Sequence, residues 1–253
     1  IMRFNLPVLV YQEKNCVHNH ADEIAQMGKN ALIVTGRNSS KKNGSLDDVI
    51  NALKSKNIKY TVYDGVEENP SVETVMEARE IGVKAGCDFI IGIGGGSPMD
   101  AAKAIGVMIY HKNENKDFLY KSVSNSQSLP VIEVPTTCGT GSEVTTVAVL
   151  TVHNEKTKKS MSHRIFPRMA LVDEKYIKNA PLKVICDTAI DALAHIVESC
   201  INNNATEYSK MFAKEGLEAW SKFKDVLLGN REATDEDFHN MMYASTLAGM
   251  CIA

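Results

Sequence analysis

A run of three glycines between an apolar segment and a helix start is the part of this sequence that most directly indicates chemistry. Residues 89–93 are apolar and rich in isoleucine, which predicts a buried strand, and the glycines at 94–96 then leave the backbone bare. Ser97 is the expected N-cap of the following helix, and Pro98 suits its first position. Free backbone N–H groups at the positive end of a helix dipole bind phosphate. The alternative is a glycine turn that serves only close packing.

A second turn of similar chemistry follows the next predicted strand. Residues 135–145 read Pro-Thr-Thr-Cys-Gly-Thr-Gly-Ser-Glu-Val-Thr, so hydroxyl groups and glycines alternate through it. Ligands of doubly wound sheets bind at the carboxyl ends of the strands. We therefore expect the two turns to lie together at one edge of the sheet.

One pair of side chains could ligate a metal ion. Asp191 and His195 are four residues apart in a predicted helix, so they share one face and could both reach one divalent cation. The alternative is a hydrogen bond between the two side chains, which the spacing alone favours.

The elements that must position these residues follow from the hydrophobic periodicity. Strands are expected at residues 6–11, 31–35, 58–63, 89–93, 129–134, 147–152 and 169–172, and helices at 21–27, 45–54, 71–85, 98–105, 184–201, 208–224 and 235–252. Alternating strands and helices predict an α/β fold with a doubly wound parallel sheet, and Pro7 suggests an edge position for the first strand. The basic residues between 156 and 164 are expected to form a solvated loop. A domain boundary is expected near Ala180, because only helical patterns follow it.

Composition excludes several other classes of protein. The net charge is −3, which gives no reason to expect nucleic acid as a partner. No apolar run is long enough for a membrane span, and no signal peptide is recognisable near the N-terminus. The six cysteines are scattered and form no Cys-x-x-Cys pair, which predicts a reducing, cytoplasmic location.

Four segments together resemble the iron-containing (group III) alcohol dehydrogenases, nearest the NADPH-dependent butanol dehydrogenases and aldehyde reductases. They are residues 94–103 (Gly-Gly-Gly-Ser-Pro-Met-Asp-Ala-Ala-Lys), 135–145, 191–195 (Asp-Ala-Leu-Ala-His) and 244–250 (Ala-Ser-Thr-Leu-Ala-Gly-Met). The resemblance implies a dehydroquinate synthase-like architecture: residues 1–180 as a dinucleotide-binding α/β domain and residues 181–253 as a partial all-helical metal-binding domain.

The resemblance also implies a nicotinamide dinucleotide cofactor and assigns residues to it. Its phosphates and ribose would be held by Gly95, Gly96, Ser97, Thr136, Thr137 and Thr140. Asn69 would line the dinucleotide cleft, and Asp100 would lie near the nicotinamide. Lys159 best matches a lysine that the family carries, with Lys158 as the alternative. Asp100 and Lys159 are therefore the candidates for catalytic as well as cofactor-binding residues.

Asp191 and His195 match two of the family's four metal ligands. The other two are histidines that follow the Ala-Gly-Met segment, whereas this chain stops at Ala253 and His239 precedes that segment. The metal would be iron(II), with zinc as the alternative. We expect this chain, truncated within its helical domain, to hold it weakly or not at all, because stable catalytic sites have at least three protein ligands.

The loop after the second predicted strand indicates NADP rather than NAD, although NAD stays open. NAD-selective enzymes often place an acidic residue there, but this strand is followed by Gly36 and no carboxylate appears before Asp47. Ser39 and Ser40 could donate to a 2′-phosphate, and the neighbouring Arg37 or Lys41 could pair with it. The alternative is a solvated turn that leads into a helix.

Three functions are compatible with these observations. The first is a metal-dependent alcohol dehydrogenase or aldehyde reductase that transfers a hydride between the cofactor and a small primary alcohol or aldehyde, impaired in this chain. The second is a dehydroquinate-synthase-like lyase, and the third is a non-catalytic nucleotide-binding fragment. The spacing of residues 191–195 and the turn at 135–145 favour the first. No nucleic-acid or membrane partner is expected, and a homodimer is left open.

Overall fold

A six-stranded parallel sheet forms the centre of the computed structural model, which describes residues 4–253. The strand order is β1-β8-β5-β4-β2-β3, and every neighbouring pair is parallel. The strands are β1 (Leu9–Gln12), β2 (Asn30–Gly36), β3 (Lys59–Val66), β4 (Phe89–Gly94), β5 (Val131–Pro135) and β8 (Met169–Val172). The predicted parallel α/β sheet is confirmed, and β1 lies at its edge as Pro7 indicated.

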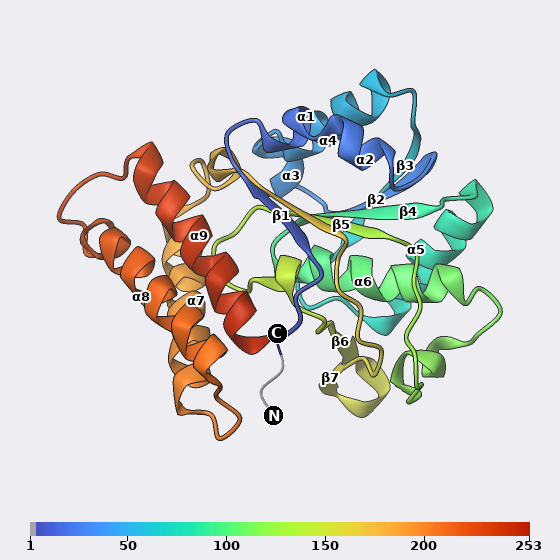
Figure 1. The fold of residues 1–253 in the computed structure, drawn as a ribbon. Coiled ribbons are helices and arrows are strands. Elements are labelled where there is room, and N and C mark those ends of the chain that lie inside the picture. Colours follow the sequence, from blue (N-terminus) through green and yellow to red (C-terminus); the bar gives the residue numbers. More distant parts are fainter. Residues whose placement is uncertain (1–3) are drawn as a thin grey trace.

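Helices cover both faces of this sheet (Figure 1). On one face lie α1 (Cys16–Asn19), α2 (Ala21–Ala25) and α4 (Ser45–Ser55); on the other lie α5 (Val72–Ala85) and α6 (Gly96–Tyr110). Successive strand residues point to opposite faces, so Ile33 and Ile91 enter the first core while Leu32 and Ile90 enter the second. This two-sided burial explains the continuous apolar runs of the central strands.

A small hairpin differs from the sequence prediction. The segment expected as a further strand of the main sheet is β6 (Val149–Val152), and it pairs antiparallel with β7 (Thr157–Ser160) in a separate two-stranded sheet. The basic stretch expected as a loop therefore supplies a strand. The short helix η3 (His153–Glu155) joins the two strands locally, so backbone pairing forms without any apolar pattern in β7.

Three long helices follow the sheet, and their core also includes Cys138, Val172 and Ile177 from the sheet and its turns. They are α7 (Leu182–Ile201), α8 (Glu207–Leu227) and α9 (Asp235–Ile252), drawn in orange and red in Figure 1. Thr206 and Thr234 begin α8 and α9 with capping boxes. The boundary expected near Ala180 falls in the connector that precedes α7. Among residues 4–253 no helix has the length and apolar character that crossing a membrane requires.

The remaining short elements are connectors, of which three bear on the site. They are α3 (Ser39–Lys42), η1 (Lys116–Tyr120), η2 (Ser142–Val144) and η4 (Glu174–Tyr176). The α3 helix follows β2, and η2 lies in the turn that follows β5.

Candidate functional site

The two predicted turns meet at the carboxyl edge of the sheet and interlock. Gly94 pairs with Pro135 in the β4–β5 ladder, and the Thr136 N–H donates to the Gly94 carbonyl at 2.8 Å. A Cβ placed on Gly95 would lie 3.1 Å from Thr137, and one placed on Gly96 would lie 2.8 Å from Thr140. The lack of side chains at Gly95 and Gly96 thus permits this close contact between the turns, and their N–H groups remain at the start of α6.

The helix begins two residues earlier than the sequence predicted. Gly95 is the N-cap of α6 and Gly96 its first residue, so Ser97 lies inside the first turn. The Ser97 hydroxyl accepts a hydrogen bond from the Asn69 N–H at 3.1 Å. The predicted cap is therefore wrong, and Ser97 instead joins the glycine turn to the loop after β3.

Two hollows flank the interlocked turns. The larger, of about 440 Å³, is lined among others by Asn69, Gly96, Ser97, Asp100, Thr140, Lys158, Asp191 and His195. The smaller, of about 300 Å³, is lined among others by Ser39, Lys42, Gly95, Thr136, Thr137 and Tyr176. Hollows of this size are typical of small-molecule sites. One elongated ligand that crosses the glycine turn would occupy both.

Lys158, and not Lys159, lies at the larger hollow. The Lys158 ammonium donates to the Asn69 side-chain oxygen at 2.7 Å. Neighbouring residues of a strand point to opposite sides, so Lys159 turns away, pairs with Glu155 and lies 5.6 Å from the Tyr120 ring centroid. The structure thus places the sequence-based alternative at the hollow and the first choice outside it.

Asp100 lies at the larger hollow but already has protein partners. Its Oδ1 accepts from the Ser142 hydroxyl at 2.6 Å, and its Oδ2 accepts from the Val149 N–H at 2.8 Å. The carboxylate therefore ties α6 to both the second turn and the hairpin. This geometry supports a positioning role for Asp100 beside the position expected for the nicotinamide.

Lys103 is a site residue that the sequence reasoning missed. Its side chain is fully buried, and its ammonium donates to the Ser142 carbonyl at 3.0 Å and the Ser142 hydroxyl at 2.7 Å. It also reaches the carbonyls of Thr145 and Val147. Lysine within an otherwise apolar helix face was the available signal, because a buried ammonium needs oxygen partners.

The loop after β2 places its two serines differently. Ser39 lines the smaller hollow, whereas Ser40 is buried with its Oγ 2.8 Å from Thr35 Oγ1. A Cβ on Gly36 would meet only the Val66 carbonyl, at 3.5 Å, so the position has room for a side chain. Ser39 is available to a ligand in this arrangement, and Ser40 instead shapes the loop.

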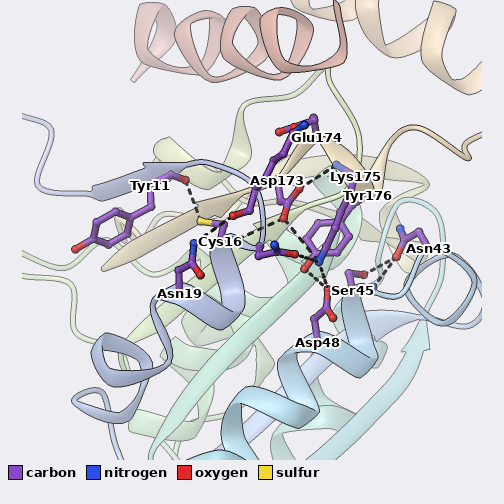
Figure 2. Close-up of polar contacts among 12 residues, drawn as sticks. Tyr11, Cys16, Asn19, Asn43, Ser45, Asp48, Asp173, Glu174, Lys175 and Tyr176 are labelled. Atoms are coloured by element: carbon purple, nitrogen blue, oxygen red, sulfur yellow. Dashed lines mark hydrogen bonds and ion pairs between the residues drawn. The ribbon is translucent and has the colours of Figure 1, made fainter. Parts of the chain in front are cut away.

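A polar cluster holds the connector between the sheet and α7, as Figure 2 shows. The Tyr176 hydroxyl donates to Asp48 at 2.8 Å, and Lys175 pairs with the same carboxylate at 2.7 Å. Asp173 accepts from the Cys16 N–H at 3.3 Å and from the Lys175 N–H at 3.0 Å. Burial raises the pKa of Asp173 and raises the pKa of the Cys16 thiol to about 12. The cluster fixes Tyr176 in the wall of the smaller hollow, and no local sequence pattern indicated it.

Asp191 and His195 both line the larger hollow from α7. The His195 Nε2 atom lies 3.9 Å from Asp191 Oδ1, and His195 Nδ1 is buried without a hydrogen-bond partner. Carboxylate and imidazole are suitable donors for iron(II) or zinc. Within residues 4–253, however, no group of three His, Cys, Asp or Glu side chains is arranged to hold a metal ion. The pair fits part of a metal site.

Comparison with known proteins agrees with this geometry. The sequence model of one family, described as iron-containing alcohol dehydrogenase, matches residues 7–174. The long-chain primary alcohol dehydrogenase AdhA of Thermoanaerobacter ethanolicus is 33% identical over 223 residues, which are 87% of this chain and 56% of that protein. The NADPH-dependent butanol dehydrogenase of Clostridium saccharobutylicum is 32% identical over 260 residues, which are 100% of this chain and 65% of that protein.

A solved structure shows the same arrangement of the chain. The iron-containing alcohol dehydrogenase of Thermotoga maritima superposes with a TM-score of 0.93 at 38% identity, covering 100% of this chain and 69% of that one. This chain thus spans between about half and about two thirds of the length of these proteins.

Proposed function

The chain belongs to the iron-containing alcohol dehydrogenase family, and from this premise we propose that it binds a nicotinamide dinucleotide across its two hollows for hydride transfer to or from a small primary alcohol or aldehyde. The observation that carries the proposal is the interlocked pair of turns between the hollows, with Asp191 and His195 in the larger one. The proposed site has a place for the pyrophosphate at the glycine turn and a place for the reacting groups beside α7.

The proposed roles of the residues follow from their positions. The N–H groups at the start of α6 face the pyrophosphate, with the hydroxyls of Thr137 and Thr140 beside them. Lys158, held by Asn69, adds a positive charge at the larger hollow. The nicotinamide would lie in that hollow, near Asp100.

Asp191 and His195 would hold the metal together with further ligands that are not among the described residues 4–253. When bound, such an ion supplies Lewis acidity at the alcohol oxygen. The residues of this chain position the cofactor, and α7 brings the Asp191 carboxylate into the same hollow. The proposed substrate, an alcohol that gives up a hydride or an aldehyde that accepts one, is small because the larger hollow has only about 440 Å³ for nicotinamide and substrate together.

Calorimetric titration of the 253-residue chain with NADPH and NADH tests the proposal. We expect saturable binding of NADPH with one molecule per chain, since both hollows are formed by residues of this chain. The proposal is refuted if neither NADPH nor NADH binds. Binding without hydride transfer to butyraldehyde would instead support the nucleotide-binding function alone.

A preference for NADPH over NADH is expected, and Gly36→Asp should reverse it. The side chain fits at Gly36, where its carboxylate would repel a 2′-phosphate and accept hydrogen bonds from a free 2′-hydroxyl. We expect the ratio of the two dissociation constants to shift by roughly tenfold or more toward NADH, since like charges in contact cost several kcal/mol. Gly36→Asn is the matched control without the charge. A wild-type chain that already prefers NADH would contradict the prediction.

Stoichiometric metal is not expected in this chain after dialysis against a chelator. Two protein donors leave most of the coordination shell to water, whereas retained catalytic metals have at least three protein ligands. Elemental analysis for iron and zinc is the measurement, with His195→Ala and the exposed His153→Ala as the paired variants. Retention of one equivalent that His195→Ala abolishes would show that further ligands complete the site.

A further inference from the structure

The turn at residues 136–143 lies between the proposed cofactor site and the helices. One side of it lines the hollows, and the other side contacts α7 and α9. A Cβ on Gly141 would lie 2.5 Å from Gly249 Cα, and a Cβ on Gly249 would lie 2.4 Å from the Gly141 carbonyl oxygen. Gly141 also has a φ of +60°, which side chains rarely adopt. The turn and α9 therefore touch backbone to backbone, which only glycines permit.

A buried hydrogen bond fixes the same contact. The Thr246 hydroxyl on α9 donates to Glu143 Oε1 at 2.9 Å, and the two residues are 3% and 2% exposed. A carboxylate taken out of water is costly unless it is paired, so this bond strongly favours one relative position of η2 and α9.

The turn also touches α7 beside the candidate metal ligand. A Cβ on Gly139 would lie 2.8 Å from the Thr188 carbonyl oxygen and 3.1 Å from Asp191 Oδ2. The neighbouring Cys138 Sγ lies 3.4 Å from the Thr188 hydroxyl. The position of this turn thus sets how far the Asp191 carboxylate lies from the cofactor turns.

We propose that Gly139 and Glu143 are positioning residues, through which the cofactor-binding turn holds α7 and α9 in register with the cofactor. The inference rests on the proposed function, because the coupling it describes runs from the dinucleotide to the helices. Residues 136, 137 and 140 line the two hollows, while residues 139, 141 and 143 contact α7 and α9. Cofactor binding stabilises the turn and, through these contacts, the segment 244–249 of α9, which lines neither hollow.

Hydrogen exchange with and without NADPH tests the coupling. In the wild-type chain we expect saturating NADPH to slow exchange about threefold or more at residues 244–249 as well as at the turn, because stabilising a contact lowers local opening. Thr246→Val should abolish the slowing at 244–249 and leave it at residues 94–98, with the NADPH dissociation constant changed by less than about threefold. Glu143→Gln keeps an acceptor for Thr246 and should retain the coupling.

Ser55→Ala is the matched control, because it removes a hydroxyl that donates a partly buried hydrogen bond to the Ala52 carbonyl within α4. It should leave the NADPH-linked slowing at 244–249 intact. Two results would overturn this inference and leave the proposed function standing. One is NADPH binding to the wild-type chain without slower exchange at 244–249, and the other is a full effect retained in Thr246→Val. If NADPH does not bind at all, the proposed function falls and the inference with it. The wild-type measurement is decisive even if the valine variant does not fold.

Discussion

Replacing Gly95 by Asp is expected to raise the NADPH dissociation constant by roughly 100-fold or more, since a buried like-charge contact costs several kcal/mol. Gly95 is the N-cap of α6, and a Cβ there points at Thr137 from 3.1 Å. A carboxylate at this position would occupy the place proposed for the pyrophosphate and repel it. Titration calorimetry of the purified chain measures the change.

The control is Gly95→Ala, because its backbone angles of −81° and −162° are open to any residue. The methyl group needs only a small shift of Thr137, so we expect a loss of affinity of less than about tenfold for this variant. Undiminished affinity in Gly95→Asp, with circular dichroism that matches the wild-type chain, would place the dinucleotide elsewhere.

Lys103→Met is expected to lower the free energy of unfolding by about 3 kcal/mol, the cost of leaving buried oxygens unpaired. Methionine matches the length of the lysine stem but donates no hydrogen bond. The carbonyls of Ser142 and Val147 would then lose their partner beneath the second turn. Urea unfolding followed by circular dichroism measures the loss, and NADPH affinity should fall with it because the turn is no longer held.

The exposed Lys222→Met serves as the control for lost charge and added hydrophobicity, and we expect a change within about 0.5 kcal/mol for it. Equal unfolding midpoints for the two variants would mean that Lys103 contributes no support to the turn. A loss of stability without any loss of NADPH affinity would mean that Lys103 stabilises the fold but is not required for the turn to bind NADPH.

The architecture was predictable because the strands are buried on both faces. Continuous apolar runs such as residues 89–93 can lie only inside a covered sheet, so periodicity and spacing indicated the parallel order. The hairpin β6–β7 was not predictable in the same way. Its second strand is Thr-Lys-Lys-Ser, and its pairing depends on a local turn rather than on burial.

Part of the candidate site was predictable, namely the residues whose type and spacing indicate a particular chemical role. Gly95, Gly96, Asp191 and His195, which residue type and spacing singled out, line the hollows. The choice between Lys158 and Lys159 depends on which side of β7 faces the hollow. In a polar strand of four residues, the sequence does not show which alternate side chains point to which face. The contacts of Lys103, and those between Glu143 and Thr246, join residues about 40 and about 100 positions apart, which no local pattern encodes.

The edge position of β1 has a consequence for how the chain reaches its fold. β1 pairs only with β8 in the main sheet, so Leu9 meets Met169 across a closed loop of about 160 residues. The strands β2, β3 and β4 pair across much shorter segments, and short loops close at lower entropic cost. During synthesis β1 therefore cannot pair until β8 has been made, whereas β2, β3 and β4 can pair with one another earlier, as one unit. The glycine turn at the end of β4 belongs to the early unit, and the helices that carry Asp191 and Thr246 can dock only afterwards.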